Sequence, residues 1–146
     1  MKLYILNGPN LNMLGTREPE HYGAVTYDGL IDMIEERCES LGITAVCRQT
    51  NHEGELVDLI QEAYFEDADG IVINPGAYTH TSIAILDAAK AVRLPLVEVH
   101  ISKVEEREEF RQVSYIRKAA VKTISGHGVS GYIEAIDFLY DMIGKH

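Results

Sequence analysis

A tyrosine and an arginine, a phenol and a cation that could stabilise its ionised form, lie five residues apart near the start of this 146-residue sequence, in a turn-rich segment from Asn7 to Gly23. A free tyrosine has a pKa near 10, so a phenolate base at pH 7 needs stabilisation of about 4 kcal/mol. One guanidinium at roughly 4 Å supplies about that energy at an effective dielectric near 20. A loop that carries Arg17 and Tyr22 over a site can act as a lid that excludes water. The alternative is a surface loop with an exposed arginine and a half-packed tyrosine.

A histidine that could donate or accept a proton directly follows the apolar run LVEV. This residue, His100, could act as a general acid or base near neutral pH. Glu98 lies two residues earlier and so on the same face of a strand, where it could fix the imidazole tautomer and favour the charged form. The alternatives are a hydrogen-bonded core histidine and a carboxylate that faces solvent.

A turn rich in small polar residues runs from Asn74 to Ser82. We expect Thr79 or Thr81 to cap the helix that follows. Free backbone N–H groups at a helix start, together with the Asn74 side chain, suit an anion or a developing enolate. Helix capping alone remains the simpler interpretation.

Two arginines in EEREEFR, Arg107 and Arg111, are four residues apart and would share one face of a helix. Arginine binds carboxylates through two parallel hydrogen bonds, so these two residues and Arg17 are candidates for a carboxylate site. A solvated charge run is the alternative.

The elements that must position these residues alternate between two hydrophobic periods. Helical spacing of apolar residues falls between short apolar runs, and the segments 8–25 and 101–119 lack a simple pattern. The alternation predicts an α/β fold: a doubly wound, five-stranded parallel sheet of order 2-1-3-4-5 with helices on both faces. Ligands bind at the carboxyl ends of such strands, where the polar residues cluster. The expected strands are Lys2–Leu6, Ile43–Cys47, Gly70–Ile73, Leu96–Val99 and Val121–Ile124.

The length and composition of the chain suit one domain over residues 1–146. A net charge of -10 argues against nucleic-acid binding through a basic face, and it requires locally concentrated positive charge if the substrate is an anion. No apolar run is long enough for a membrane span, and the N-terminus fits a first strand better than a signal peptide. Cys38 and Cys47 lack metal-ligand spacing and fit reduced thiols in a cytoplasmic protein.

Four colinear blocks closely resemble the type II 3-dehydroquinate dehydratases. The blocks are NGPNLNMLGTREPEHYG (7–23), NHEGELVDLIQEA (51–63), INPGAYTHTSIAILDA (73–88) and VEVHISKVEEREEFRQVSY (97–115). The resemblance implies a flavodoxin-like fold and a hydro-lyase of the shikimate pathway, which serves aromatic amino acid biosynthesis, or of the quinate pathway. The implied reaction is the reversible dehydration of 3-dehydroquinate, a small anion, to 3-dehydroshikimate through an enolate. The resemblance also implies no metal, no organic cofactor and a homododecamer built from trimers.

The resemblance assigns four catalytic residues. Tyr22 is implied as the base and Arg17 as its partner on the lid. His100 is implied as the proton donor to the departing hydroxyl group. Asn10, together with the substrate-binding Asn74, is implied to hold water or the enolate oxygen.

The other implied residues bind substrate. Ile101 and Ser102 would offer backbone and hydroxyl contacts to the substrate carboxylate, and His80 and Arg111 would bind substrate hydroxyl groups. Asp87 resembles a residue that reaches the site of a neighbouring subunit.

Four residues at three places depart from the family pattern, and none is a matched catalytic position. They are His21, Lys103 and the pair Arg117-Lys118, the last of which stands where the family commonly has Ser-Pro. Lys103 is the lysine near a carboxyl strand end, so it is the candidate for a competing Schiff-base route.

A flavodoxin-like, non-enzymatic binding module is the alternative function. A phospho-receiver needs an aspartate at the end of the third strand, where this chain has Asn74. A flavin carrier needs a Ser/Thr/Gly-rich phosphate loop after the first strand, whereas this loop is rich in asparagine and proline. The sequence therefore favours the enzyme.

Overall fold

Five parallel strands form one sheet in the order β2-β1-β3-β4-β5. The structure is a computed structural model that describes residues 1–16 and 25–144. The number, direction and order of the strands confirm the sequence prediction. The strands are β1 (Lys2–Asn7), β2 (Thr44–Gln49), β3 (Gly70–Asn74), β4 (Leu96–His100) and β5 (Lys122–Ser125).

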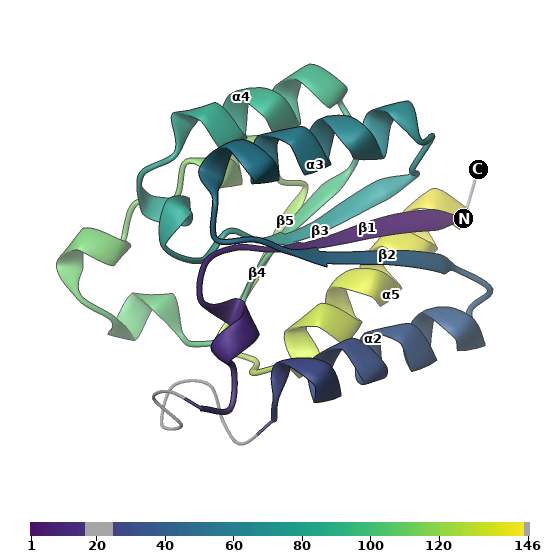
Figure 1. Ribbon diagram of the computed structural model, residues 1–146, viewed down its shortest axis with the longest axis horizontal. Coiled ribbons are helices and arrows are strands. Elements are labelled where there is room, and N and C mark those ends of the chain that lie inside the picture. Colours follow the sequence, from purple (N-terminus) through teal and green to yellow (C-terminus); the bar gives the residue numbers. More distant parts are fainter. Residues whose placement is uncertain (17–24, 145–146) are drawn as a thin grey trace.

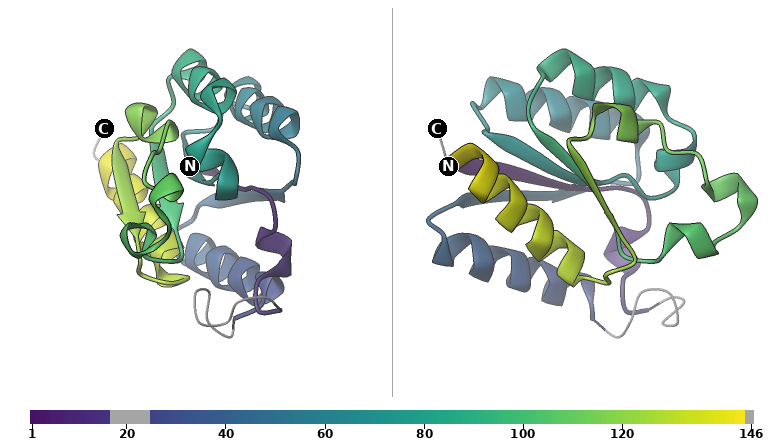
Figure 2. Two further views of the ribbon diagram at one scale, coloured as in Figure 1. Left: turned by 90° about the vertical axis from the view of Figure 1, so that its left-hand side faces the viewer. Right: turned by 180° about the vertical axis from the view of Figure 1, so that it is seen from behind.

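Helices cover both faces of the sheet, as predicted (Figure 1). Helices α2 and α5 lie on one face, and α3 and α4 lie on the other. The views in Figure 2 show the same three layers, with β5 at one edge of the sheet. Within the described residues, no helix is long and apolar enough to cross a membrane. The helices are α2 (Tyr27–Ser40), α3 (Glu53–Phe65), α4 (Ile83–Val92) and α5 (Ser130–Gly144).

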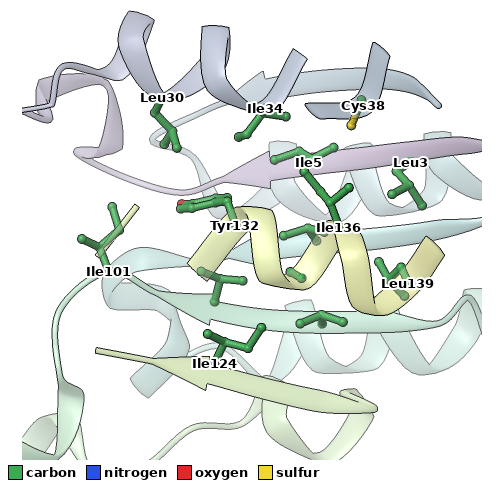
Figure 3. Close-up of a cluster of buried hydrophobic side chains, with 14 of the residues drawn as sticks. Leu3, Ile5, Leu30, Ile34, Cys38, Ile101, Ile124, Tyr132, Ile136 and Leu139 are labelled. Atoms are coloured by element: carbon green, nitrogen blue, oxygen red, sulfur yellow. The ribbon is translucent and has the colours of Figure 1, made fainter. Parts of the chain in front are cut away.

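The strand period of two divides the apolar residues between two cores. Leu3 and Ile5 of β1 pack toward α2 and α5, whereas Tyr4 and Leu6 pack toward α3 and α4. Figure 3 shows the first core, in which the ring of Tyr132 from α5 lies among aliphatic side chains. The central strands are buried on both faces and are held in place from both sides.

Side chains cap the starts of α2 and α4, although the α4 cap differs from the prediction. Thr26 caps α2 by accepting a hydrogen bond of 3.1 Å from the backbone N–H of Gly29. Ser82 caps α4 by accepting one of 3.0 Å from the N–H of Ile85. The expectation of Thr79 or Thr81 as the α4 cap was wrong, because a 3-10 turn, η2 (Gly76–His80), separates the strand end from the helix.

All five strands extend further at their carboxyl ends than the apolar runs indicated. Asn7, Asn74 and His100 are therefore the last residues of β1, β3 and β4, not residues that follow them. Asn7 and Asn74 are direct partners in the register of β1 and β3. The segment 101–119 lacked a simple pattern because it contains short 3-10 turns: η3 (Val104–Glu106), η4 (Glu109–Arg111) and η5 (Ile116–Ala119).

Candidate active site

A pocket opens at the carboxyl ends of β1, β3 and β4. This is the position that the strand-end rule predicts for a ligand site in a parallel sheet. It brings together seven of the predicted site residues: Asn10, Asn74, His80, His100, Ile101, Ser102 and Arg111. The rest of the described lining is Pro9, Leu11, Gly76, Ala77, Val104 and Arg107.

Three predicted site residues are not among these. Asp87 is exposed on α4, away from the pocket lining. Arg17 and Tyr22 lie outside the described residues. The structure places Arg107, an earlier carboxylate candidate, in the lining beside Arg111.

Two glycines allow the loops after β1 and β3 to approach each other closely. A Cβ atom at Gly8 would lie 2.3 Å from the carbonyl oxygen of Pro75, so a larger residue cannot occupy this position. Gly76 has a φ of 62°, and a Cβ there would lie 3.0 Å from the carbonyl oxygen of Pro9. The N–H of Gly8 donates to the carbonyl of Asn74 at 2.8 Å. These contacts bring the turn that carries Asn10 and the strand end that carries Asn74 to one wall of the pocket.

Asn10 adopts a left-handed backbone conformation at the pocket rim, with a φ of 70°. Asparagine tolerates this conformation better than most residues. The backbone N–H of Asn10 donates to the side-chain oxygen of Asn51 at 3.1 Å. Gln49 donates to the same Asn51 oxygen and to the carbonyl of Gly8, both at 3.1 Å. Asn51 and Gln49 therefore hold the loop that carries Asn10.

A buried chain of three polar side chains fixes the orientation of Asn74. The Tyr132 hydroxyl donates to the side-chain oxygen of Asn7 at 2.6 Å and accepts from the side-chain nitrogen of Asn74 at 2.9 Å. The Asn74 oxygen accepts from the N–H of Gly76 at 3.1 Å. Because the side-chain nitrogen of Asn74 donates to one partner and its oxygen accepts from another, the orientation of the amide is determined. The second amide proton can then serve the pocket, which Asn74 lines. Sequence reasoning did not identify Tyr132 as a site residue, because a helical pattern does not reveal the partners of its hydroxyl.

His100 is held by a buried carboxylate. Its Nε2 lies 2.5 Å from Oε2 of Glu98, and the two residues share the α3–α4 face of β4. Because a carboxylate only accepts hydrogen bonds, Nε2 carries the proton and Nδ1 is left for other contacts. Glu98 has no exposed surface, so the alternative of a solvent-facing carboxylate was wrong.

Four residues surround the Glu98 carboxylate. Besides His100, Ser114 donates to it at 2.8 Å, Thr123 at 3.1 Å, and Arg117 from Nε at 3.1 Å and from Nη2 at 3.3 Å. Burial opposes the charge on Glu98, but the hydrogen bonds from His100 and Arg117 outweigh it and lower the pKa of Glu98 to about 2. The carboxylate is therefore ionised throughout the neutral range.

His80 presents a hydrogen-bond acceptor to the pocket. Its Nδ1 lies 2.7 Å from the carbonyl oxygen of Val113, so Nδ1 must carry the proton. Burial lowers the pKa of His80, which favours the neutral ring. A neutral ring with a protonated Nδ1 leaves a lone pair on Nε2, which suits a substrate hydroxyl group.

Positive charge is concentrated at this pocket, although the chain has 23 acidic and 13 basic residues. Arg107 and Arg111 line it, and none of its described lining residues is acidic. Arg107 donates to the hydroxyl of Ser102 at 3.2 Å, and Arg111 pairs with Glu108. This arrangement provides the local positive charge that an anionic substrate requires. Within residues 1–16 and 25–144, no cluster of histidine, cysteine and acidic side chains has the arrangement of a metal site.

Comparisons with known proteins agree with this geometry. The family model described as Dehydroquinase class II matches residues 1–140. A 3-dehydroquinate dehydratase of Clostridium perfringens is 52% identical over 143 residues, which cover 98% of this chain and 99% of that protein. The crystal structure of a type II dehydroquinase from Butyrivibrio crossotus has a TM-score of 0.94 at 54% identity and covers 95% of this chain and 97% of that one. A type II dehydroquinase from Propionibacterium acnes has a TM-score of 0.91 at 40% identity, with 96% of both chains covered. This chain belongs to the class II dehydroquinases.

Proposed function

We propose that this chain removes water from 3-dehydroquinate to give 3-dehydroshikimate, with Tyr22 as the base and His100 as the acid. Family membership supports the overall reaction and does not favour the non-enzymatic module. The observation that carries the mechanism is the buried Glu98–His100 pair at a strand end, beside a pocket lined by amides and guanidinium groups.

The substrate carboxylate would bind where backbone N–H groups and a hydroxyl meet positive charge. We assign it to Ile101 and Ser102 at the end of β4, with Arg107 beside the serine hydroxyl. We assign the substrate hydroxyl groups to Arg111 and to Nε2 of His80, because one donates and the other accepts. Donors and acceptors on both sides of the pocket would orient the ring for reaction.

The first chemical step breaks a C–H bond next to the ketone. The Tyr22 phenolate takes the proton, and the electron pair moves into an enolate whose charge rests on oxygen. Asn74, with its free amide proton, and Asn10 would hold that oxygen directly or through a water molecule. Asn74 is oriented before the substrate arrives, so its dipole does not need to reorganise as the charge develops.

The second step breaks the C–O bond of the departing hydroxyl group. The enolate re-forms the ketone, a carbon–carbon double bond forms, and the His100 imidazolium supplies the proton that makes the leaving group water. The ionised Glu98 carboxylate stabilises that imidazolium and holds its ring. The phenol of Tyr22 and the neutral imidazole then exchange protons with solvent to complete the cycle.

The base requires a neighbouring cation. Lowering a phenol pKa from near 10 to 7 takes about 4 kcal/mol, and desolvation raises the requirement. Arg17 is five residues away in sequence, and Arg107 provides a second guanidinium at the pocket. We therefore propose Arg17 as the principal partner of Tyr22.

We propose that the active unit is a homododecamer built from trimers, in which Asp87 reaches the site of a neighbour. Three exposed apolar side chains that flank η2 support a covered surface at this end of the molecule: Ile83, Phe110 and Val113 are 54%, 70% and 51% exposed. Asp87 lies one turn beyond Ile83 on the exposed side of α4. A second subunit packed here would bury the apolar side chains and bring Asp87 toward a pocket other than its own.

We place the enzyme in the cytoplasm and propose no nucleic-acid partner. Cys38 and Cys47 are free thiols, one buried and one half-buried, which fits a reducing compartment. The net charge of -10 disfavours contact with phosphate backbones.

A continuous assay for the conjugated enone product tests the function. The purified chain with 3-dehydroquinate should produce a rising enone absorbance in the presence of a metal chelator and without an added cofactor. Borohydride added during turnover should trap no imine on Lys103 or any other lysine. A folded protein that gives no enone would contradict the proposed reaction, and a borohydride adduct would contradict the enolate route.

A further inference from the structure

Arg117 is connected through Glu98 to His100, the acid of the proposed mechanism, and it is not one of the described residues that line the pocket. We propose that Arg117 is a positioning residue that acts through Glu98 and sets the pH range over which His100 donates its proton. This inference rests on the proposed function of His100.

The geometry links Arg117 to His100 through one carboxylate. Nε of Arg117 donates to Oε1 of Glu98 at 3.1 Å, and Nη2 donates to Oε2 at 3.3 Å. Oε2 also accepts from His100 Nε2 at 2.5 Å. Glu98 is fully buried, whereas the Arg117 side chain is 45% exposed at the start of η5. A surface cation therefore holds both oxygens of the buried carboxylate that orients the acid.

Two cations share the charge of this carboxylate when His100 is protonated. With Arg117 present, the buried negative charge is already partly balanced, so the imidazolium is held less strongly and gives up its proton more readily. Without Arg117, the imidazolium is the remaining cation bonded to Glu98. The proton would then stay on His100 to higher pH, and His100 would be a weaker acid.

The other charged groups near His100 do not provide this link. The described titratable groups that face the same region are Glu98 on β4, His80 on η2, and Arg107 and Arg111 of the segment after β4. His80, Arg107 and Arg111 line the pocket, so changing any of them would also alter substrate binding. Arg117 is not part of the described lining, and its effect on the acid can be separated from binding.

The adjacent residue provides a matched control. Lys118 is an exposed cation on the same turn, and it is not one of the Glu98 partners. Lys118→Gln removes the same unit of charge from the same surface. Arg117→Lys keeps the charge of Arg117 but loses the pair of hydrogen bonds from Nε and Nη2 to Glu98.

The test is the pH dependence of kcat and KM for the full chain and for Arg117→Gln, Arg117→Lys and Lys118→Gln. For Arg117→Gln we expect the alkaline limb of kcat to move to higher pH by about half to one unit, a modest shift because the guanidinium is partly exposed. We expect kcat on the plateau to fall roughly 3- to 10-fold with KM within about twofold. Arg117→Lys should recover most of the shift, and Lys118→Gln should match the parent chain. Overlapping profiles for the parent chain and Arg117→Gln would overturn the proposal, as would an equal shift in Lys118→Gln.

An NMR titration of the His100 ring gives a readout that does not depend on turnover. The midpoint of His100 protonation should rise by about half to one pH unit in Arg117→Gln and stay unchanged in Lys118→Gln. An unchanged midpoint in Arg117→Gln would refute the coupling even if kcat fell. If the midpoint of His100 moves in Arg117→Gln but neither the parent chain nor any variant forms enone, the proposed function is contradicted. The link between Arg117 and His100 would still be supported.

Discussion

The hydroxyl of Tyr132, on the last helix, accepts a hydrogen bond of 2.9 Å from the side-chain nitrogen of Asn74, at the end of β3. Both groups are buried, and they lie 58 residues apart in sequence. The contact connects the core between the sheet and α5 to the wall of the active site. It also determines the orientation of the Asn74 amide. The Tyr132 hydroxyl donates its proton to Asn7, so it can only accept from Asn74, and the Asn74 nitrogen must point toward it.

We predict that Tyr132→Phe lowers kcat by about 10- to 100-fold with a small change in KM. This is less than the roughly 100- to 1,000-fold cost of losing a donor outright, because the Asn74 amide loses its orienting partner but is still present. The ring still fills the core, so the protein should fold with a reduced Tm. The control is Tyr140→Phe, which removes a partly exposed hydroxyl from the same helix and should leave kcat unchanged. A Tyr132→Phe enzyme with lower Tm but normal kcat would show that the hydroxyl serves stability alone.

Glu98 should contribute acid-sensitive stability. Its pKa falls from an ordinary 4.5 to about 2 on folding, so its contribution is fully present above about pH 4.5 and is lost as the pH falls toward 2. The size of the shift corresponds to about 3 kcal/mol. We predict that Glu98→Gln unfolds at lower urea concentration at pH 7 and that its deficit relative to the parent chain shrinks between pH 5 and pH 2. A deficit that is constant over this range would contradict the assignment.

Arg111 should affect binding more than chemistry. Its guanidinium lines the pocket and is already oriented by Glu108. We predict that Arg111→Gln raises KM about 10- to 100-fold, the value of a charge-assisted hydrogen bond, with a smaller change in kcat. Steady-state kinetics on 3-dehydroquinate distinguishes this outcome from a kcat-only defect, which would place Arg111 in the chemical step instead.

Asp87 allows a complementation test of the proposed trimer. Asp87→Ala and His100→Ala should each have low activity, because each of their sites lacks one group. In mixed trimers, an Asp87→Ala subunit beside a His100→Ala neighbour regains a complete site, so random co-assembly should restore about one quarter of the parent activity. Failure to regain activity in trimers shown to be mixed would mean that Asp87 does not act across the interface.

The sheet was predictable because hydrophobic periodicity reports directly on burial. Short apolar runs between helically spaced segments predicted five parallel strands, and the right-handed crossover rule predicted their order, which the structure confirms. The predicted ends were too short, because Asn7, Asn74 and His100 are polar and end the apolar runs while still pairing in the sheet. A hydrophobic pattern cannot identify a strand residue whose side chain serves the site.

The pocket residues were predictable in part because strand ends and turns carry recognisable chemistry. His100 and Glu98 share a strand face by simple alternation, and the structure pairs them at 2.5 Å. The roles of Tyr132 and Arg117 were not predictable in this way. Each contacts its partner across a long stretch of sequence, 58 residues for Tyr132 and 19 for Arg117, and such contacts depend on how the helices and turns pack.

The rate of enone formation by Tyr22→Phe tests the two-residue acid–base mechanism most directly. The substitution removes the ionisable hydroxyl and keeps the ring. We predict that kcat falls by about 100- to 10,000-fold, the usual contribution of a general base, while the protein stays folded and still binds the substrate. Turnover by a folded Tyr22→Phe enzyme within a few-fold of the parent chain would contradict the mechanism.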